Sequence, residues 1–127
     1  MAASENGHAD IVRRLLDSGS DVNAKCNDGW SALNVAVQNG HIRIVDLLLL
    51  NKANVNSKDI NGRTALMMAS FKGNNAVVRL LLEAQANVND KDANGWTPLM
   101  LASFNNNADT CLLLIESGAI VKEKSTK

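Results

Sequence analysis

An excess of charge of either sign is missing from this chain of 127 residues, because 13 Lys and Arg balance 13 Asp and Glu. With a formal net charge of zero, the chain has no overall basic field, so we expect no nucleic-acid partner. The same balance argues against adsorption to an anionic membrane. Apolar runs are short, as at Leu47–Leu50, and none approaches the ~20 residues that cross a bilayer. We therefore expect no membrane partner either.

Cysteine is also scarce, with Cys26 and Cys111 as the only two. Two cysteines are too few for a disulfide scaffold and no Asn-x-Ser/Thr sequon is present, so we expect an intracellular, cytoplasmic protein. Neither cysteine has a histidine nearby that would activate it, and His8 and His41 lack further ligands at metal-binding spacing. The glycines form no phosphate-binding loop. These absences predict no catalytic residue, no metal and no cofactor, and hence no enzyme.

What the chain does have is internal repetition at a period of 33 residues. One block stands at Asp28–Leu33, at Asn61–Leu66 and at Asn94–Leu99. A later block, which reads Asn-Gly-His and then Ile-Val, stands at 6–12 and at 39–45. We therefore interpret residues 1–127 as a single domain with repeats of about 1–25, 26–58, 59–91 and 92–124. The first repeat is partial, because it starts inside its first helix.

Each repeat carries the start and stop signals of two helices. The Asp-Gly and Asn-Gly pairs favour turns, and the hydroxyl residues that follow them are expected helix N-caps: Ser31, Thr64 and Thr97. Short first helices are predicted at Leu33–Asn39, Leu66–Lys72 and Leu99–Asn105. Each should end at a left-handed residue: Gly40, Gly73 and Asn106. The second helix of each repeat is apolar on one face, and only stacked copies bury such faces.

These blocks resemble the ankyrin-repeat family, whose signature is Thr-Pro-Leu-His-x-Ala. Here the signature reads Thr97–Ala102, with looser copies at Thr64–Ala69 and Ser31–Ala36. The resemblance spans the chain and implies an all-α solenoid of stacked helix-turn-helix units with β-hairpin loops. In the family the signature histidine ties neighbouring loops together. It is replaced here by Asn34, Met67 and Met100, so we expect less rigid loops.

Register across the repeats also predicts which residues are buried. Cys111 aligns with Val78 and is expected to be a small buried residue, whereas Cys26 aligns with Asp92 at the start of a hairpin and is expected to be exposed. Asp90 and Asp92 are interpreted as solvated surface. The ends are more polar than the middle, as in Arg14 of the first repeat and Thr110 of the last. Terminal repeats need a polar outer face in contact with solvent, so this pattern favours a complete four-repeat array over a fragment of a longer one.

The family resemblance implies a concave partner-binding surface, formed by the hairpin tips and the exposed positions of the first helices. All four aromatic residues of the chain fall at these positions. Tryptophan is enriched at binding hot spots, methionine is an adaptable contact residue, and arginine can stack on aromatic rings. The predicted partner-binding residues are Trp30, Arg63, Met67, Phe71, Lys72, Trp96, Met100, Phe104 and Asn105.

Several alternatives to this surface stay open at the level of sequence. The two tryptophans could fold over neighbouring hairpins as packing, and the two phenylalanines could pack against the next repeat. The same residues could support a structural or self-associating role, with Leu50 and Leu112 as a second apolar contact. The chain could also be a regulatory or inhibitory segment of a larger signalling protein. We expect a monomer that binds an unidentified protein partner, with weak self-association as the alternative.

Overall fold

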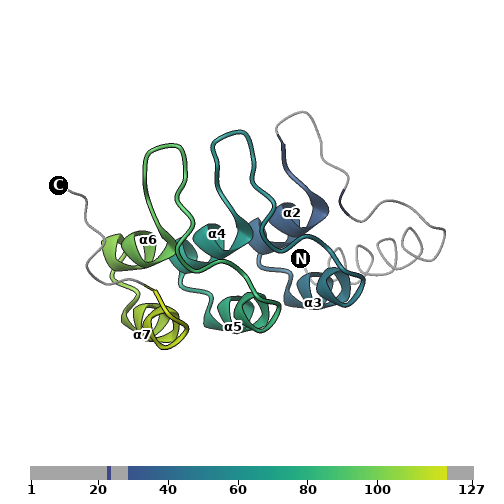
Figure 1. Ribbon diagram of the computed structural model, residues 1–127. Helices are drawn as coiled ribbons and strands as arrows, with labels where there is room; N and C mark the ends of the chain where they lie inside the picture. The colour runs from purple at the N-terminus through teal and green to yellow at the C-terminus, as the bar shows by residue number, and fades with distance from the viewer. Residues whose placement is uncertain (1–22, 24–28, 120–127) are drawn as a thin grey trace.

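The computed structural model describes residue 23 and residues 29–119. Its described helices are α2 (Ala32–Gln38), α3 (Ile42–Leu50), α4 (Ala65–Lys72), α5 (Asn75–Glu83), α6 (Pro98–Phe104) and α7 (Ala108–Glu116). Figure 1 shows α2, α4 and α6 side by side in one row, and α3, α5 and α7 in a second row. We call the two rows the first helices and the second helices. Long loops project from the row of first helices, and no described residue lies in an extended strand (Figure 1).

The first helices begin one residue earlier than the sequence predicts, directly after the predicted N-caps. Ser31, Thr64 and Thr97 have extended backbone angles, and their hydroxyl oxygens accept a hydrogen bond from the backbone N–H three residues later. Each hydroxyl thus satisfies one of the N–H groups that a helix start leaves unpaired. Pro98 occupies the first turn of α6, where it has no N–H to leave unpaired. The predicted N-caps are confirmed.

The ends of the first helices also follow the prediction. Gly40 and Gly73 have φ of +72° and +73°, and Asn106 has φ of +60° at the equivalent place. At Gly73 a Cβ would also lie 2.7 Å from Oδ1 of Asn107, so the Asn107 side chain would have to move to admit one. The second helices are followed by positive-φ residues too: Lys52 after α3, Gln85 after α5 and Gly118 after α7. A residue with a side chain is strained in the left-handed conformation, so Lys52 and Gln85 fit their positions less well than glycine would.

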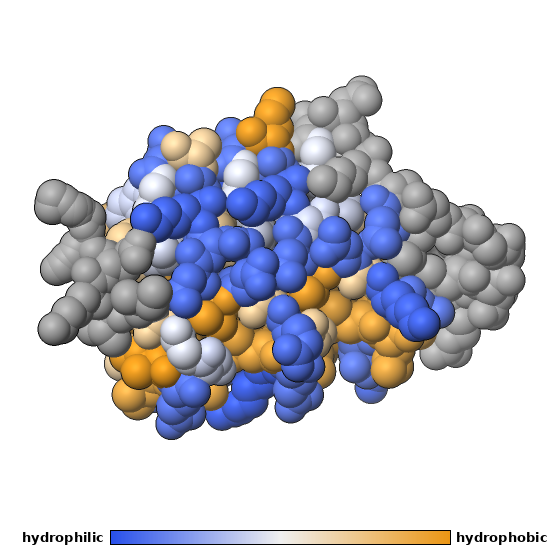
Figure 2. Space-filling model, in the orientation of Figure 1, coloured by the Kyte–Doolittle hydropathy of each residue, from blue (hydrophilic) through white to orange (hydrophobic). Residues whose placement is uncertain are grey.

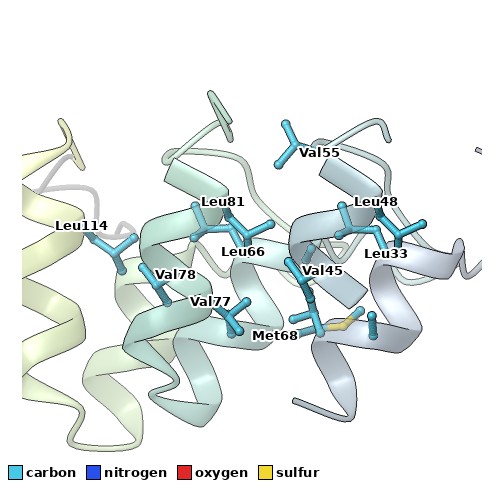
Figure 3. Close-up of a cluster of buried hydrophobic side chains, with 14 of the residues drawn as sticks. Leu33, Val45, Leu48, Val55, Leu66, Met68, Val77, Val78, Leu81 and Leu114 are labelled. Carbon is cyan, nitrogen blue, oxygen red and sulfur yellow. The ribbon is translucent and has the colours of Figure 1, made fainter. Parts of the chain in front are cut away.

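The core lies between the two rows and between neighbouring repeats (Figure 3). The second helices contribute most of the large side chains, among them Val45, Leu48, Val77, Leu81 and Leu114, all fully buried. The first helices contribute Leu33 and Leu66 together with the small residues Ala36, Ala69 and Ala102, all of which are buried. Helix α4, which packs against both α2 and α6, is buried from Ala65 to Ser70. The repeats therefore share one continuous core, as stacking requires.

Asparagine side chains tie successive repeats together outside this core. Oδ1 of Asn23 accepts the backbone N–H of Asn54 at 2.6 Å, and Oδ1 of Asn56 accepts that of Asn87 at 2.7 Å. In the last described repeat, Nδ2 of Asn89 donates to the carbonyl of Gly118 at 3.2 Å. These residues belong to the Val-Asn pairs that recur along the sequence. The asparagine of each pair therefore links its repeat to the next through a hydrogen bond between its side chain and a backbone group.

The prediction of a polar outer face at the last repeat is wrong at Thr110. Thr110 is fully buried in α7, and its hydroxyl donates to Oδ1 of Asn75 at the start of α5. The hydroxyl is accommodated inside the stack because a polar partner from the neighbouring repeat meets it there. Arg14, which supported the same prediction at the first repeat, lies outside the described residues.

Candidate functional site

Two aspartates fix the projecting turns that carry Arg63 and Trp96. Oδ1 of Asp59 accepts the backbone N–H groups of Asn61 and Arg63 at 2.8 and 2.9 Å. Oδ1 of Asp92 makes the same pair of bonds to Asn94 and Trp96, also at 2.8 and 2.9 Å. Asp59 is buried and Asp92 half-buried, so the interpretation of Asp92 as solvated surface is wrong. Their carboxylates close the turns, since Asp readily bonds the backbone of a following turn.

The two turns are also held to each other. The backbone N–H of Ala93 donates to the carbonyl of Asn61 at 2.9 Å, which joins the tip of one loop to the next. Gly62 allows this approach, because a Cβ there would lie 3.0 Å from the backbone nitrogen of Ala93. The loops before α4 and α6 are therefore registered by backbone bonds, although the signature histidine is absent. Cys26, which stands in the register of Asp59 and Asp92, lies outside the described residues.

The four aromatic residues divide into two kinds. Trp30 is half-buried and packs against the core. Trp96 is half-buried and meets Phe104 edge to face, with ring centroids 5.5 Å apart and an interplanar angle of 85°. Phe71 and Phe104 stay exposed, at 41% and 69% of their surface. The exposed aromatic surface therefore lies on the first helices α4 and α6 rather than on the loops.

The end of α4 that carries Phe71 is held by the loop between α6 and α7. Nδ2 of Asn105 donates to the carbonyl of Phe71 at 2.7 Å, and Nδ2 of Asn107 donates to the same carbonyl at 2.8 Å. Asn107 also donates to the carbonyl of Ser70 at 2.9 Å. These bonds satisfy carbonyls that the helix end leaves without an intrahelical partner. Asn105, a predicted partner contact, thus uses its amide to position Phe71.

The prediction that Met67 contacts a partner is wrong, because Met67 has 0% of its surface exposed. Its side chain turns back over the start of α4, where Sδ lies 3.5 Å from the backbone nitrogen of Thr64. Asn34 behaves in the same way in α2, where its Oδ1 accepts the backbone N–H of Ser31 at 3.3 Å. The signature position therefore faces the helix cap in both repeats. Met100, at the same position of α6, is half-buried.

A groove of about 270 Å³ opens across the first helices, and we call it the first-helix groove. Its lining residues come from α2, from α4 with the residue before its N-cap, and from α6: Gln38, Arg63, Met67, Met68, Phe71, Lys72 and Leu101. The base is apolar, because Met68 is buried, Leu101 is half-buried and Met67 lies beneath the surface. Arg63 and Lys72 are exposed and are its only charged lining residues. Three of the predicted contact residues, Arg63, Phe71 and Lys72, therefore meet at one hollow.

Met68 and Leu101 line this groove but were not among the predicted contact residues. Both share the register of Val35. In the structure that register varies: Met68 is buried, Leu101 is half-buried and Val35 is 44% exposed. Met68 lies on α4, which packs against both α2 and α6. The shared register of Val35, Met68 and Leu101 predicted that they lie on the same face of their helices, but not how deeply each side chain is buried.

Groups that could support catalysis or metal binding are sparse in the part of the chain that the structure describes. No cluster of three or more His, Cys, Asp or Glu side chains occurs there that could hold a metal ion. Partial burial raises the pKa of the Cys111 thiol, which lowers its thiolate content near neutral pH. Cys111 is half-buried rather than buried as its register predicted. No described helix is long and apolar enough to cross a bilayer.

The comparison with protein families agrees with this architecture. The family model for ankyrin repeats in three copies matches residues 1–59 and 49–125, which together span nearly the whole chain. The chain therefore belongs to the ankyrin-repeat family. Ankyrin repeats are generally protein–protein interaction modules and typically have no enzymatic activity. No curated protein matches the chain.

Proposed function

We propose that this protein binds a partner protein on a concave surface formed by the first-helix groove, Phe104 and the adjoining loop turns. One observation carries the proposal: an apolar hollow crosses the first helices while Phe71 and Phe104 remain exposed beside it. Exposed phenylalanine is costly to leave in water and contributes strongly when an interface covers it. The remaining predicted contacts, Arg63, Lys72 and Met100, lie on the same elements. Trp96 supports Phe104 by its edge-to-face contact.

The backbone of this surface is ordered before any partner binds, because hydrogen bonds fix its turns and the end of α4. Asp59 and Asp92 close the turns, and Asn105 and Asn107 hold the end of α4. A surface that is ordered before binding loses less conformational entropy when the partner arrives. The main energetic gain is then the burial of the parts of the two phenylalanine side chains that are still exposed, 41% of Phe71 and 69% of Phe104.

The test compares three versions of the immobilised protein for what each captures from a cell lysate. They are the parent, a first-helix variant Phe71→Gln/Phe104→Gln, and a matched second-helix variant Leu50→Gln/Leu112→Gln. Leu50 and Leu112 are exposed at 73% and 59%, so both variants replace two exposed apolar residues with glutamine. Helical circular dichroism and thermal unfolding must first show that all three fold alike.

The proposal predicts proteins that are captured by the parent and by the second-helix variant but not by the first-helix variant. Capture lost only in the second-helix variant would move the binding surface to the opposite row. Equal capture by all three versions would mean that the exposed phenylalanines take no part in binding.

Self-association is a second candidate, and one observation favours it. The second helices expose Leu50, Leu112 and Ile115, and Figure 2 shows hydrophobic residues gathered along this row on the face in view. Hydrophilic groups cross that band, so it is not one continuous apolar patch (Figure 2). We expect a monomer whose mass is independent of concentration in sedimentation equilibrium. A mass that rises with concentration in the parent, and not in Leu50→Gln/Leu112→Gln, would establish self-association instead.

We place this protein in the cytoplasm, as the lack of glycosylation sequons and of a disulfide framework suggests. Thiol labelling in intact cells tests this, because free Cys26 and Cys111 side chains are expected in a reducing compartment. Recovery of the protein with oxidised cysteines from an extracellular fraction would contradict the placement.

A further inference from the structure

We propose that the first-helix groove binds an acidic segment of the partner, with one large apolar side chain in the groove and neighbouring carboxylates paired to Arg63 and Lys72. This inference rests on the proposed function, because it assumes that the concave surface binds protein. It adds the chemistry of the segment that this surface recognises.

The size of the groove favours a single side chain. Its volume of about 270 Å³ lies below the ~300–1,000 Å³ that is usual for small-molecule and cofactor sites. Its base is formed by methionine and leucine, and methionine adapts to differently shaped apolar groups. The exposed ring of Phe71 borders the same hollow. A leucine or aromatic side chain, carried on an extended or helical segment, fits this chemistry.

The charges around the groove favour an acidic occupant. Neither Arg63 nor Lys72 forms an ion pair with a carboxylate in the described ranges, and both side chains are exposed. Lys72 is the only charged residue on the first helices that the structure describes, so these helices carry no carboxylate. Incoming carboxylates would therefore meet two cations that have no ion-pair partner among the described residues. An arginine or lysine of the partner would meet no opposite charge within the groove.

The loops around the groove do not reverse this preference. Their described arms carry Lys58 and Lys91 against Asp59, Asp90 and Asp92. Two of these three carboxylates, those of Asp59 and Asp92, already accept backbone N–H groups of their own turns. The backbone bond from Arg63 to Asp59 fixes where the arginine side chain starts, so it can present its planar donors to a carboxylate in a defined place.

The second helices have the opposite balance of charge. Their described residues include four carboxylates, on Asp46, Glu83, Asp109 and Glu116, against two guanidinium groups, on Arg43 and Arg79. An acidic segment is therefore attracted to the row of first helices and repelled from the row of second helices. Such complementarity mainly sets orientation and association rate. Two cations are too few for general nucleic-acid binding, whose affinity scales with the number of phosphates neutralised.

The probe for this proposal is a phage-displayed library of random linear peptides, selected on the parent protein. Selected peptides are synthesised and their affinities measured against three further folded proteins. The first is the Phe71→Gln/Phe104→Gln variant, which tests the proposed function. The second is Arg63→Glu/Lys72→Glu, which reverses the two groove cations. The third is Arg43→Glu/Arg79→Glu, which makes the same change of charge on the second helices.

The expected peptides combine a large apolar residue with adjacent Asp or Glu. Their affinity should fall about tenfold or more in Arg63→Glu/Lys72→Glu and by less than about threefold in Arg43→Glu/Arg79→Glu. Lysine in place of the acidic residues should restore binding to the reversed variant. Because Lys72→Glu puts a negative charge at a helix end, Arg63→Gln/Lys72→Gln serves as a second, milder variant and should also weaken binding.

Two different failures can be told apart. Peptides that require Phe71 and Phe104 but show no acidic preference, and bind the reversed variant equally well, would overturn the acidic segment and leave the proposed function standing. Peptides that bind the Phe71→Gln/Phe104→Gln variant as well as the parent would overturn both, as would a selection that enriches no peptide at all.

Discussion

The first and second helices are built from the same repeats but carry different chemistry. The second helices α3, α5 and α7 are nine residues each and bury large side chains such as Leu48, Leu81 and Leu114. The first helices α2, α4 and α6 are shorter and bury Leu33 and Leu66 together with small alanines, but they also carry exposed Phe71 and Phe104 on the outside. Both rows therefore stabilise the stack, and the row of first helices adds an apolar, cationic surface outside.

The comparison teaches that stability and recognition can be separated in this molecule. A substitution of a buried residue on the second helices should act through unfolding. A substitution of an exposed residue on the first helices should act through binding alone. This separation is expected for stacked repeats, in which each unit is stabilised by contacts with its neighbours rather than by its outer surface.

The largest effect is expected for Leu81→Ala, because Leu81 is fully buried between repeats. Removing a buried leucine side chain leaves a cavity and costs about 2–5 kcal/mol of unfolding free energy. Urea unfolding followed by circular dichroism measures this loss. Leu50→Ala on the neighbouring second helix is the matched control, and it should stay within about 0.5 kcal/mol because Leu50 is exposed. Similar losses for both leucines would contradict the assigned core.

The next effect is expected at the cap of α4. Thr64→Ala removes the hydroxyl that accepts the backbone N–H of Met67, which should cost about 1 kcal/mol. Thr64→Ser retains the hydroxyl and should lose less. Thermal unfolding compares the two variants. If serine proves as destabilising as alanine, the methyl group rather than the cap is the stabilising feature.

An increase in stability is expected at the ends of the second helices. Gln85 has φ of +73°, in the conformation that glycine adopts at Gly118 in the following repeat. Gln85→Gly should relieve this strain and raise the unfolding free energy by about 0.5–1 kcal/mol, net of the added freedom of the unfolded chain. Arg79→Gly, at an exposed position in the middle of α5, should instead destabilise by about 1 kcal/mol. A loss of stability in Gln85→Gly would show that its side chain makes a contribution larger than the strain.

The smallest effect concerns the reactivity of Cys111. Burial raises the pKa of its thiol, so less thiolate is present at a given pH than in a free cysteine. In a Cys26→Ser background, labelling by a maleimide should therefore reach its half-maximal rate at a higher pH than for free cysteine. The same measurement on the urea-unfolded chain serves as the control. Identical profiles for the folded and unfolded chains would contradict the raised pKa.

Much of the fold could be predicted because its signals are local and recur at a fixed period. The N-caps at Ser31, Thr64 and Thr97 and the left-handed ends at Gly73 and Asn106 follow from residue type and register. Burial was harder to predict, because it depends on which side chain of a neighbouring repeat lies opposite. Thr110 is the clearest example, since Asn75 of the preceding repeat makes its burial tolerable.

The candidate surface could be predicted only in part, because the register of a residue does not fix which way its side chain turns. Phe71, Phe104, Arg63 and Lys72 are exposed, as their register indicated, but Met67 folds back over its own helix cap. The role of the aspartates that close the turns could have been predicted, because Asp59 and Asp92 each stand two residues before an Asn-Gly pair. The amides of Asn105 and Asn107 carried no such signal, since their acceptors are backbone carbonyls of the preceding repeat.

The most direct test of the separation between the two rows is site-specific photo-crosslinking in cells. A photoreactive phenylalanine analogue replaces either Phe104 on α6 or Leu112 on α7, which are exposed to a similar extent. We predict a crosslinked partner protein with the probe at position 104 and none with the probe at position 112. A crosslink at position 112 alone would contradict the account, because it would place recognition on the second helices.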